Sequence, residues 1–272
     1  MLATTAAGYA LVPPAPGLPA AAWWFRLVEA LAGTALVAAG TNALNQVLER
    51  DVDALMRRTA ARPLPAGRLH VGDAAAFALL CGASGVWLLA ERVNALTAVL
   101  AAFTLVSYVG AYTPLKRRTS LATLIGAVPG ALPIVGGWTA AGGALDAGAA
   151  SLFAILFFWQ LPHFLALSWI YRDDYARAGL RMLSVGDTEG DATFRQARLQ
   201  ALVLVPVSLL PAALSVAGPI YFAGALVLSS WFAHVAIAAA RVRSHDAARR
   251  LFRASLVYLP VILALLVLDR AT

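Results

Sequence analysis

Long apolar stretches separated by short polar ones dominate the pattern of this chain. The apolar stretches fall near residues 1–13, 24–48, 73–91, 94–113, 120–141, 148–170, 199–216, 219–240 and 251–268. Most have about 20 residues, the length at which a helix crosses a hydrocarbon layer of about 30 Å. The pattern therefore predicts an all-α polytopic membrane protein with about nine transmembrane helices, the first of them short.

Composition favours the same class of protein. Of the 272 residues, 61% are hydrophobic and 13% are charged, whereas soluble domains carry about 25% charged residues. The linkers are short except after the second and the sixth stretch, where about 24 residues lie outside the apolar pattern, and linkers of that length are often functional. We expect residues 1–272 to form one domain.

The basic residues mark one side of the membrane. Nearly all of the 21 lysines and arginines follow the second, fourth, sixth and eighth stretches. Because cytoplasmic loops carry the excess of lysine and arginine, we expect a multi-pass protein of a bacterial cytoplasmic (inner) membrane, with its N-terminus inside and its C-terminus outside. The formal charge of +7 therefore reports topology and does not indicate a nucleic-acid partner.

Three polar side chains close the second stretch on this basic side. Asn45, Glu49 and Asp53 are four residues apart, so in a helix they form one stripe. An uncompensated carboxylate at membrane depth costs roughly 2.5–3.5 kcal/mol. Mg²⁺ commonly joins carboxylates to phosphate oxygens, and several arginines follow the stripe. We predict that these three residues are catalytic and hold Mg²⁺; the alternative is an ordinary polar helix end.

A second acidic group, Asp174 with Tyr175, follows the sixth stretch. It faces the same side as the first, so the two groups are candidates for holding two metals around one diphosphate. The alternative is a solvated loop in which neighbouring arginines balance the acids. Cations suited to a diphosphate are also on this side, and our candidates are Arg62, Lys116, Arg117 and Arg172.

His163 lies inside the sixth stretch. An ionisable side chain at membrane depth is a functional hypothesis by default, so His163 is a candidate contact for haem or a quinone. The alternative is a histidine whose hydrogen bonds are satisfied within the core.

Several segments together resemble a known family. Residues 45–53 resemble the N-x-x-x-D-x-x-x-D motif of the intramembrane aromatic prenyltransferases, the ubiquinone-biosynthesis prenyltransferase superfamily. The segments 62–68, 112–117, 159–164 and 174–183 look like its protohaem IX farnesyltransferase (haem O synthase) branch. The chain departs from the family pattern at Glu49, where aspartate is usual, and at Ala178, where the second motif lacks an acid.

The resemblance implies a bundle around a central cavity that faces the cytoplasm and opens to the lipid bilayer. It implies that Mg²⁺ and the basic residues hold farnesyl diphosphate. The farnesyl group is then transferred to a vinyl group of haem b, water is added, and haem O and diphosphate are released. Hand-over of the product to a haem A synthase or a terminal oxidase would follow.

Other functions stay open at this point. A prenyltransferase acting on a quinone precursor such as 4-hydroxybenzoate shares the first motif. A transporter with intramembrane carboxylates is a more remote alternative, and it predicts interrupted helices in paired halves of the chain, which the pattern does not contain. A catalytically inactive membrane scaffold is the third alternative.

Overall fold

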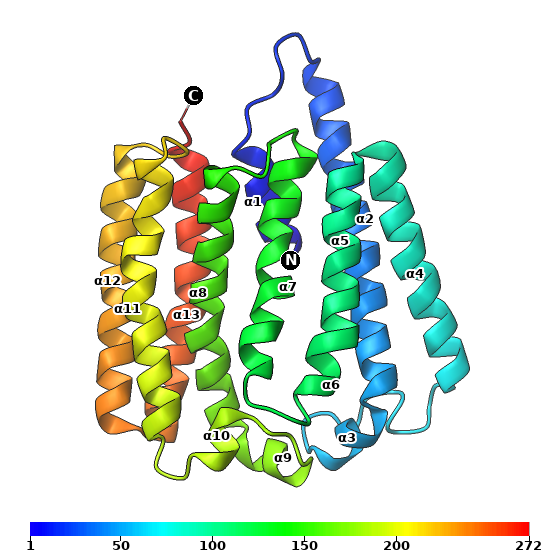
Figure 1. Cartoon of the computed structure of the whole chain (residues 1–272), viewed down its shortest axis with the longest axis vertical. Helices are drawn as coiled ribbons and strands as arrows, with labels where there is room; N and C mark the ends of the chain where they lie inside the picture. The colour runs from blue at the N-terminus through cyan, green and yellow to red at the C-terminus, as the bar shows by residue number, and fades with distance from the viewer. Residues whose placement is uncertain (272) are drawn as a thin grey trace.

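The computed structural model describes residues 1–271, and the regular elements among these residues are helices (Figure 1). Eight of the helical segments are long and apolar enough to cross a membrane. They are α2 (Ala20–Leu48), α4 (Val71–Arg92), α5 (Ala95–Ser107) continued by η1 (Tyr108–Tyr112) and α6 (Thr113–Leu115), α7 (Ala122–Ala140), α8 (Ala147–Ile170), α11 (Asp191–Ala213), α12 (Pro219–Val242) and α13 (His245–Leu268). With the short α1 (Leu2–Ala10), the predicted all-α bundle of about nine helices is confirmed.

Helix α1 covers only part of the depth of the bundle. Its nine residues span about 14 Å at 1.5 Å per residue. It packs on α7 at two glycines, because a Cβ at Gly8 would collide with the Ile134 carbonyl and one at Gly137 with the Thr5 carbonyl. Figure 1 marks the N-terminus part-way along the bundle. The structure therefore does not bring Met1 to the basic end, where the sequence analysis expected it.

Several helices begin before the apolar stretch that predicted them. The stretch at 199–216 belongs to a helix that starts at Asp191, and the stretch at 251–268 belongs to one that starts at His245. Side chains cap both early starts: Asp187 accepts a hydrogen bond from the Thr193 N–H, and Ser244 accepts one from the Ala247 N–H. Apolar stretches locate the membrane-embedded part of a helix, whereas its polar extension depends on capping.

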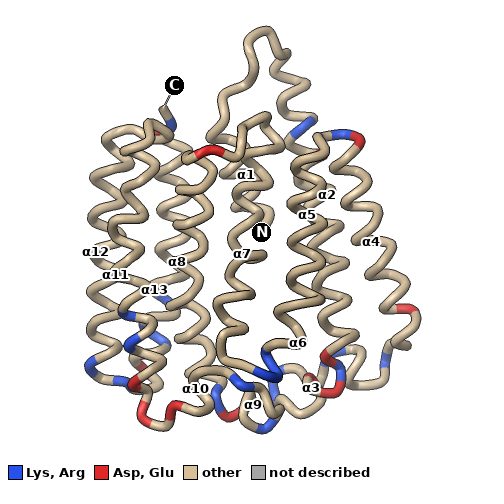
Figure 2. The backbone as a smooth tube through the Cα atoms, viewed as in Figure 1, with Lys and Arg blue, Asp and Glu red and all other residues tan. Residues whose placement is uncertain are grey.

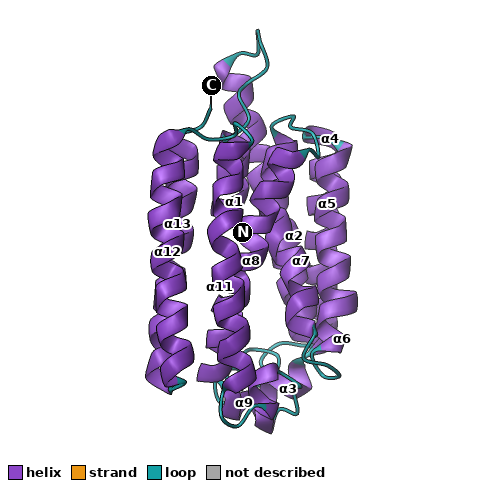
Figure 3. Cartoon of the chain, turned by 60° about the vertical axis from the view of Figure 1, so that its left-hand side comes forward, coloured by secondary structure: helices purple, strands orange, loops and turns teal. Residues whose placement is uncertain are grey.

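The helices pack as two groups joined through α7 and α8. Helices α2, α4, α5 and α7 contact one another in sequence, α8 packs with α11 and α13, and α12 lies between α11 and α13. Figure 3 shows the helices running along a common axis. The largest buried cluster belongs mainly to the second group, where Leu152, Phe232, Leu251 and Tyr258 are fully enclosed. This group is therefore more extensively buried than the first group.

One end of the bundle carries most of the charge. Figure 2 shows lysine, arginine, aspartate and glutamate gathered at the end where three short helices lie. These are α3 (Arg50–Leu55), α9 (Arg172–Arg177) and α10 (Leu183–Gly186). Helices α2 and α8 both end here, and α13 ends at the opposite side. The two long linkers predicted to be functional therefore meet at one end of the bundle.

Candidate active site

The predicted acidic stripe crosses a break between two helices. Glu49 separates α2 from α3 with φ −109° and ψ 8°, outside helical geometry. The hydrogen bonds nevertheless continue, since the Glu49 N–H donates to the Asn45 carbonyl (3.0 Å) and the Asp53 N–H donates to the Glu49 carbonyl (2.7 Å). The expectation of one uninterrupted helix is corrected to a bent one. The bend leaves Glu49 and Asp53 only 3% and 1% exposed.

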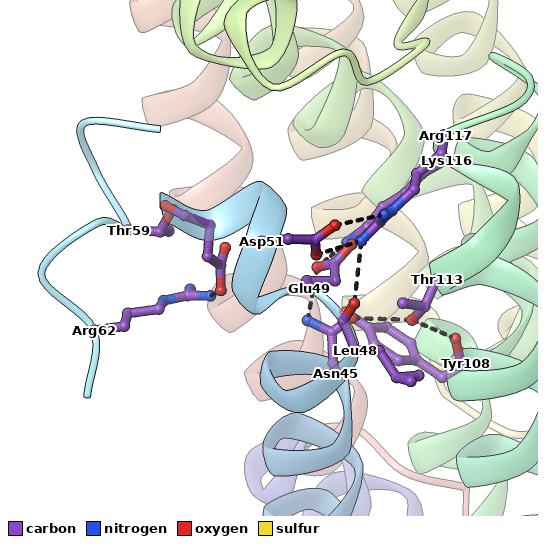
Figure 4. A network of polar contacts seen from close by, with 11 residues as sticks. Asn45, Leu48, Glu49, Asp51, Thr59, Arg62, Tyr108, Thr113, Lys116 and Arg117 are labelled. Atoms are coloured by element: carbon purple, nitrogen blue, oxygen red, sulfur yellow. Dashed lines mark hydrogen bonds and ion pairs between the residues drawn. The ribbon is translucent and has the colours of Figure 1, made fainter. Parts of the chain in front are cut away.

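Glu49 is the centre of a buried polar network (Figure 4). Its Oε2 accepts a hydrogen bond from Asn45 Nδ2 (3.1 Å) and forms an ion pair with Lys116 Nζ. Asn45 Oδ1 lies 3.0 Å from the Thr113 hydroxyl, which anchors the amide from the other side. Glu49 Oε1 is buried with no hydrogen-bond partner among the described residues. A buried, unpaired carboxylate oxygen is costly, and it is a free acceptor for a cation.

Asp53 is paired with a different cation. Arg62 Nη1 donates to its Oδ2 at 2.8 Å, and the Thr59 hydroxyl donates to the Asp53 carbonyl at 2.9 Å. Helix α3 is held in place by its apolar side, because Val52 and Met56 join a buried cluster with residues of α9. The basic loop after α3 therefore folds back onto the acid that precedes it.

The second acidic group reaches the first through its tyrosine. Tyr175 is buried against α3, and Arg58 lies over the neighbouring Tyr171 ring at 5.3 Å. Burial raises the pKa of Tyr175, and the Arg58 charge partly opposes this rise. Asp174 instead forms an ion pair with Arg177 on its own helix. The structure thus places Tyr175 beside α3 and commits Asp174 to a local contact.

Two of the predicted diphosphate cations are committed elsewhere. Arg117 donates to both oxygens of Asp51 (3.0 and 2.8 Å) and to the Leu48 carbonyl (3.1 Å), all on the exposed surface. Arg172 lies over the Trp169 ring at 4.5 Å and donates to the Thr188 carbonyl at 3.3 Å. Both were predicted from proximity in sequence, which does not fix the direction of a long side chain. Arg62 and Lys116 are the predicted cations that contact the acids.

His163 belongs to an aromatic stack between α8 and α13. Its Nδ1 lies 2.8 Å from the Ser255 hydroxyl, and its ring packs on Trp159 and Phe252 at centroid distances of 5.2 and 4.8 Å. The histidine thus has a polar partner of its own, and among the described residues it makes no hydrogen bond with the acidic network.

The sequence reasoning missed four contributors to this site. They are Arg58, Tyr108, Tyr112 and Thr113. The Lys116 ammonium lies 5.2 Å over the Tyr112 ring, a cation–π distance. Tyr108–Tyr112 forms a turn of π-helix, a conformation that is frequent at functional sites. The two tyrosines four residues apart before Thr113 were the available signal, but a π-turn leaves no mark in an apolar pattern.

The oxygen donors suit a hard cation. Mg²⁺ takes oxygen ligands, usually one or two carboxylates together with water and substrate phosphate. Glu49 offers a free buried oxygen, Asp53 is buried one helical turn further along the chain, and the Asn45 oxygen has a second lone pair beyond its contact with Thr113. Within residues 1–271 no group of three histidine, cysteine, aspartate or glutamate side chains is placed for a metal. A dedicated cage of such side chains is therefore absent from the described residues.

Comparison with solved structures identifies the fold. The chain aligns with a structure of digeranylgeranylglyceryl phosphate synthase with a TM-score of 0.80, at 14% identity, over 98% of this chain and 92% of the other. A UbiA homologue from Archaeoglobus fulgidus, bound to DMAPP and Mg²⁺, aligns with a TM-score of 0.65, at 15% identity, over 97% and 94%.

Sequence comparison reaches closer relatives. A protein of Solibacter usitatus named protohaem IX farnesyltransferase is 46% identical over 263 residues, which cover 93% of this chain and 90% of that protein. The UbiA prenyltransferase family description matches residues 1–259. The bundle, the acidic network at its charged end and these similarities agree, and the chain belongs to the UbiA prenyltransferase family.

Proposed function

We propose that this protein transfers the farnesyl group of farnesyl diphosphate to a vinyl group of haem b, with addition of water, to give haem O and diphosphate. Three relatives that carry the name protohaem IX farnesyltransferase are 46–47% identical over more than nine-tenths of the chain. The structural observation that carries the proposal is the buried network of Asn45, Glu49 and Lys116, with one carboxylate oxygen left free.

In this proposal Asn45, Glu49 and Asp53 hold Mg²⁺ together with the substrate diphosphate. The bound ion would neutralise negative charge that grows on the leaving group. The A. fulgidus homologue, whose structure contains DMAPP and Mg²⁺, supports the use of this metal in the family. The basic end of the bundle faces the cytoplasm, in agreement with the excess of lysine and arginine there.

The two cations have a role that follows from their present partners. Lys116 and Arg62 each pair with a buried carboxylate. If Glu49 and Asp53 held a metal ion, the ammonium and the guanidinium would be free to pair with diphosphate oxygens. They then stabilise the negative charge that forms as the allylic C–O bond breaks. The site therefore exchanges internal ion pairs for substrate ion pairs without bringing in new charges.

The farnesyl cation must be kept away from water until the last step of the reaction. The C–O bond electrons leave with diphosphate, the vinyl π electrons form the new C–C bond, and water adds to the resulting carbocation with loss of a proton. Apolar helices around the site protect the farnesyl cation from early hydrolysis. We also propose that a haem A synthase or a terminal oxidase receives the product.

The decisive experiment supplies the purified full chain in lipid nanodiscs with haem b, farnesyl diphosphate and Mg²⁺. Mass spectrometry of extracted haem should detect haem O, and pyrophosphate should appear in equal amount. Asp53→Asn should lower both by about 10²–10³-fold, whereas Asp246→Asn, an exposed acid of the same end, should leave both unchanged. If 4-hydroxybenzoate is prenylated and haem b is not, the haem assignment is wrong.

A further inference from the structure

A second hollow lies at the charged end, apart from the acidic network. It is an open groove of about 690 Å³ between the segment after α6 and the α9–α10 segment. Its walls include Leu180, Met182, Leu183 and Val185, together with small residues of α9 and α11. Grooves of this volume accommodate ligands of the size of a drug or cofactor. We call it the α9–α10 groove.

Two arginines from different segments line this groove. Arg118 follows α6, and Arg181 precedes α10. Both are exposed, and neither side chain has an ion pair or a hydrogen bond to another described residue. The acid in the lining, Asp187, accepts a hydrogen bond from the Thr193 N–H at 2.7 Å. Its carboxylate is therefore engaged with a backbone N–H in the first turn of α11. The groove therefore offers two uncommitted guanidiniums above a mostly apolar floor.

The groove continues towards the membrane, and its wall is hydrogen-bonded to the backbone of an active-site residue. A narrower hollow of about 180 Å³ shares Ser120 and Leu183 with it and runs between α7, α8 and α11, where Leu161 and Leu165 line it. In the other direction, the Arg181 N–H donates to the Lys116 carbonyl at 3.0 Å. One wall of the groove is thus bonded to the backbone of the residue that pairs with Glu49.

We infer that the α9–α10 groove is a docking site for the haem substrate, an inference that rests on the proposed function. Haem b is a planar apolar ring with two carboxylates on one edge, and arginine binds carboxylates in a bidentate fashion. Arg118 and Arg181 pair with the propionates while the apolar walls cover the ring. The Met182 thioether in the wall is a soft ligand of the kind that haem iron accepts.

The proportions of the two hollows favour haem over a phospholipid. A phospholipid has one small anionic head and two long acyl chains. Here the wide part carries the two arginines, and the apolar extension is the smaller part. The extension of about 180 Å³ is too small for two acyl chains, whereas the wide part of about 690 Å³ has room for a rigid ring.

The test compares haem b with its dimethyl ester, which has the same ring and no propionate charge. Binding to the full chain in nanodiscs is measured by the haem absorption spectrum, without farnesyl diphosphate. The wild-type protein should bind haem b about tenfold more tightly than the ester, because two charge-assisted contacts are lost on esterification. The double variant Arg118→Gln/Arg181→Gln should bind both equally. Arg250→Gln, an exposed arginine of α13 outside the groove, should behave as wild type.

Three outcomes test haem docking in the groove separately from the farnesyl transfer reaction. The proposed docking site is wrong if the wild type binds haem b and its dimethyl ester equally, even if haem O is formed. It is also wrong if the double variant still prefers haem b to the ester. A preference lost only in the double variant supports the groove even if no haem O is formed, and in that case the proposed function fails alone. Loss of co-purifying anionic lipid in the double variant, with unchanged haem binding, also overturns the inference. Thermal unfolding of each variant confirms that it folds.

Met182 gives a second, independent readout. Met182→Leu keeps the volume of the side chain and removes the sulfur. If the thioether contacts iron, the absorption spectrum of the bound ferrous haem should change while the affinity falls only a few-fold. An identical spectrum would remove Met182 from the proposed contacts.

Discussion

Two ion pairs join the same two segments of this protein, and they differ in almost every physical respect. Lys116 pairs with Glu49 and Arg117 pairs with Asp51, so the two cations are adjacent in sequence and the two acids are two residues apart. The side chains of the first pair are 11% and 4% exposed, and those of the second are 38% and 62% exposed. One pair faces the interior and the other faces water.

The difference separates a reactive pair from a supporting one. Surface ion pairs contribute at most about 1 kcal/mol, whereas removing one partner of a buried pair strands the other charge at a cost of about 3–5 kcal/mol. Burial lowers the pKa of Lys116 to about 7, and the neighbouring Arg117 charge lowers it further. The inner pair therefore holds charges that a substrate can recruit, and the outer pair fastens α3 to the end of α6.

The largest expected effect is on the inner pair. Lys116→Met should lower pyrophosphate release by about 10²–10³-fold and should lower the free energy of unfolding by about 3 kcal/mol, because Glu49 is left without its cation. Adding Glu49→Gln should restore most of the stability, measured by thermal unfolding, and none of the activity. Recovery of activity in the double variant would show that Lys116 acts only through folding.

Arg62 extends the comparison to a half-exposed cation, since its side chain is 34% exposed and that of Asp53 is 2%. Arg62→Gln should raise the KM for farnesyl diphosphate by about 30-fold, because one charge-assisted contact is lost, with a smaller change in kcat. Arg68→Gln is the matched control: it lies in the same loop and contacts only the Ala61 carbonyl. Equal effects from both variants would mean that general positive charge, and not the Asp53 contact, matters.

A smaller effect is expected at the second acidic group. Asp174 pairs with Arg177 on the same helix, so its replacement disturbs α9 rather than the Glu49 network. Asp174→Asn should lower haem O formation by about tenfold, and Asp173→Asn, an exposed neighbour, should leave the rate unchanged. The pair itself contributes only a few tenths of a kcal/mol, and a tenfold loss corresponds to about 1.4 kcal/mol. Most of the expected loss therefore comes from the disturbance of α9. A loss as large as that of Asp53→Asn would instead indicate a second metal at Asp174.

The smallest effect is expected at the outer pair. Arg117→Gln should change the rate by less than about twofold and the free energy of unfolding by less than about 1 kcal/mol. The Arg117 hydrogen bonds lower the pKa of Asp51. The contribution of the pair is therefore present at neutral pH and is lost as the pH falls through that lowered pKa. Thermal unfolding at neutral and acidic pH, at low salt, measures the difference from wild type.

Much of the fold followed from the apolar pattern, because membrane-spanning helices need long apolar stretches. The sequence also singled out Glu49 and Asp53 as candidate site residues, because carboxylates are exceptional at the end of a membrane span. The pattern did not reveal that the helix bends at Glu49, since backbone angles at a single residue leave no periodic mark. Nor did it distinguish Arg62 and Lys116 from Arg117 and Arg172, because the partner of a flexible cation depends on contacts between distant segments.

The π-turn at Tyr108–Tyr112 has a consequence for how this site tolerates change. The Thr113 hydroxyl lies 2.9 Å from the Tyr108 carbonyl and also holds Asn45. A π-helical turn contains one more residue than an α-helical turn. It therefore sets the direction in which the side chains after it point. Deleting a single residue there would swing Thr113 and Lys116 by about 100° around the helix axis. The site is therefore encoded by a count of residues as well as by their identities, and substitutions at these positions should be survivable where a deletion is not.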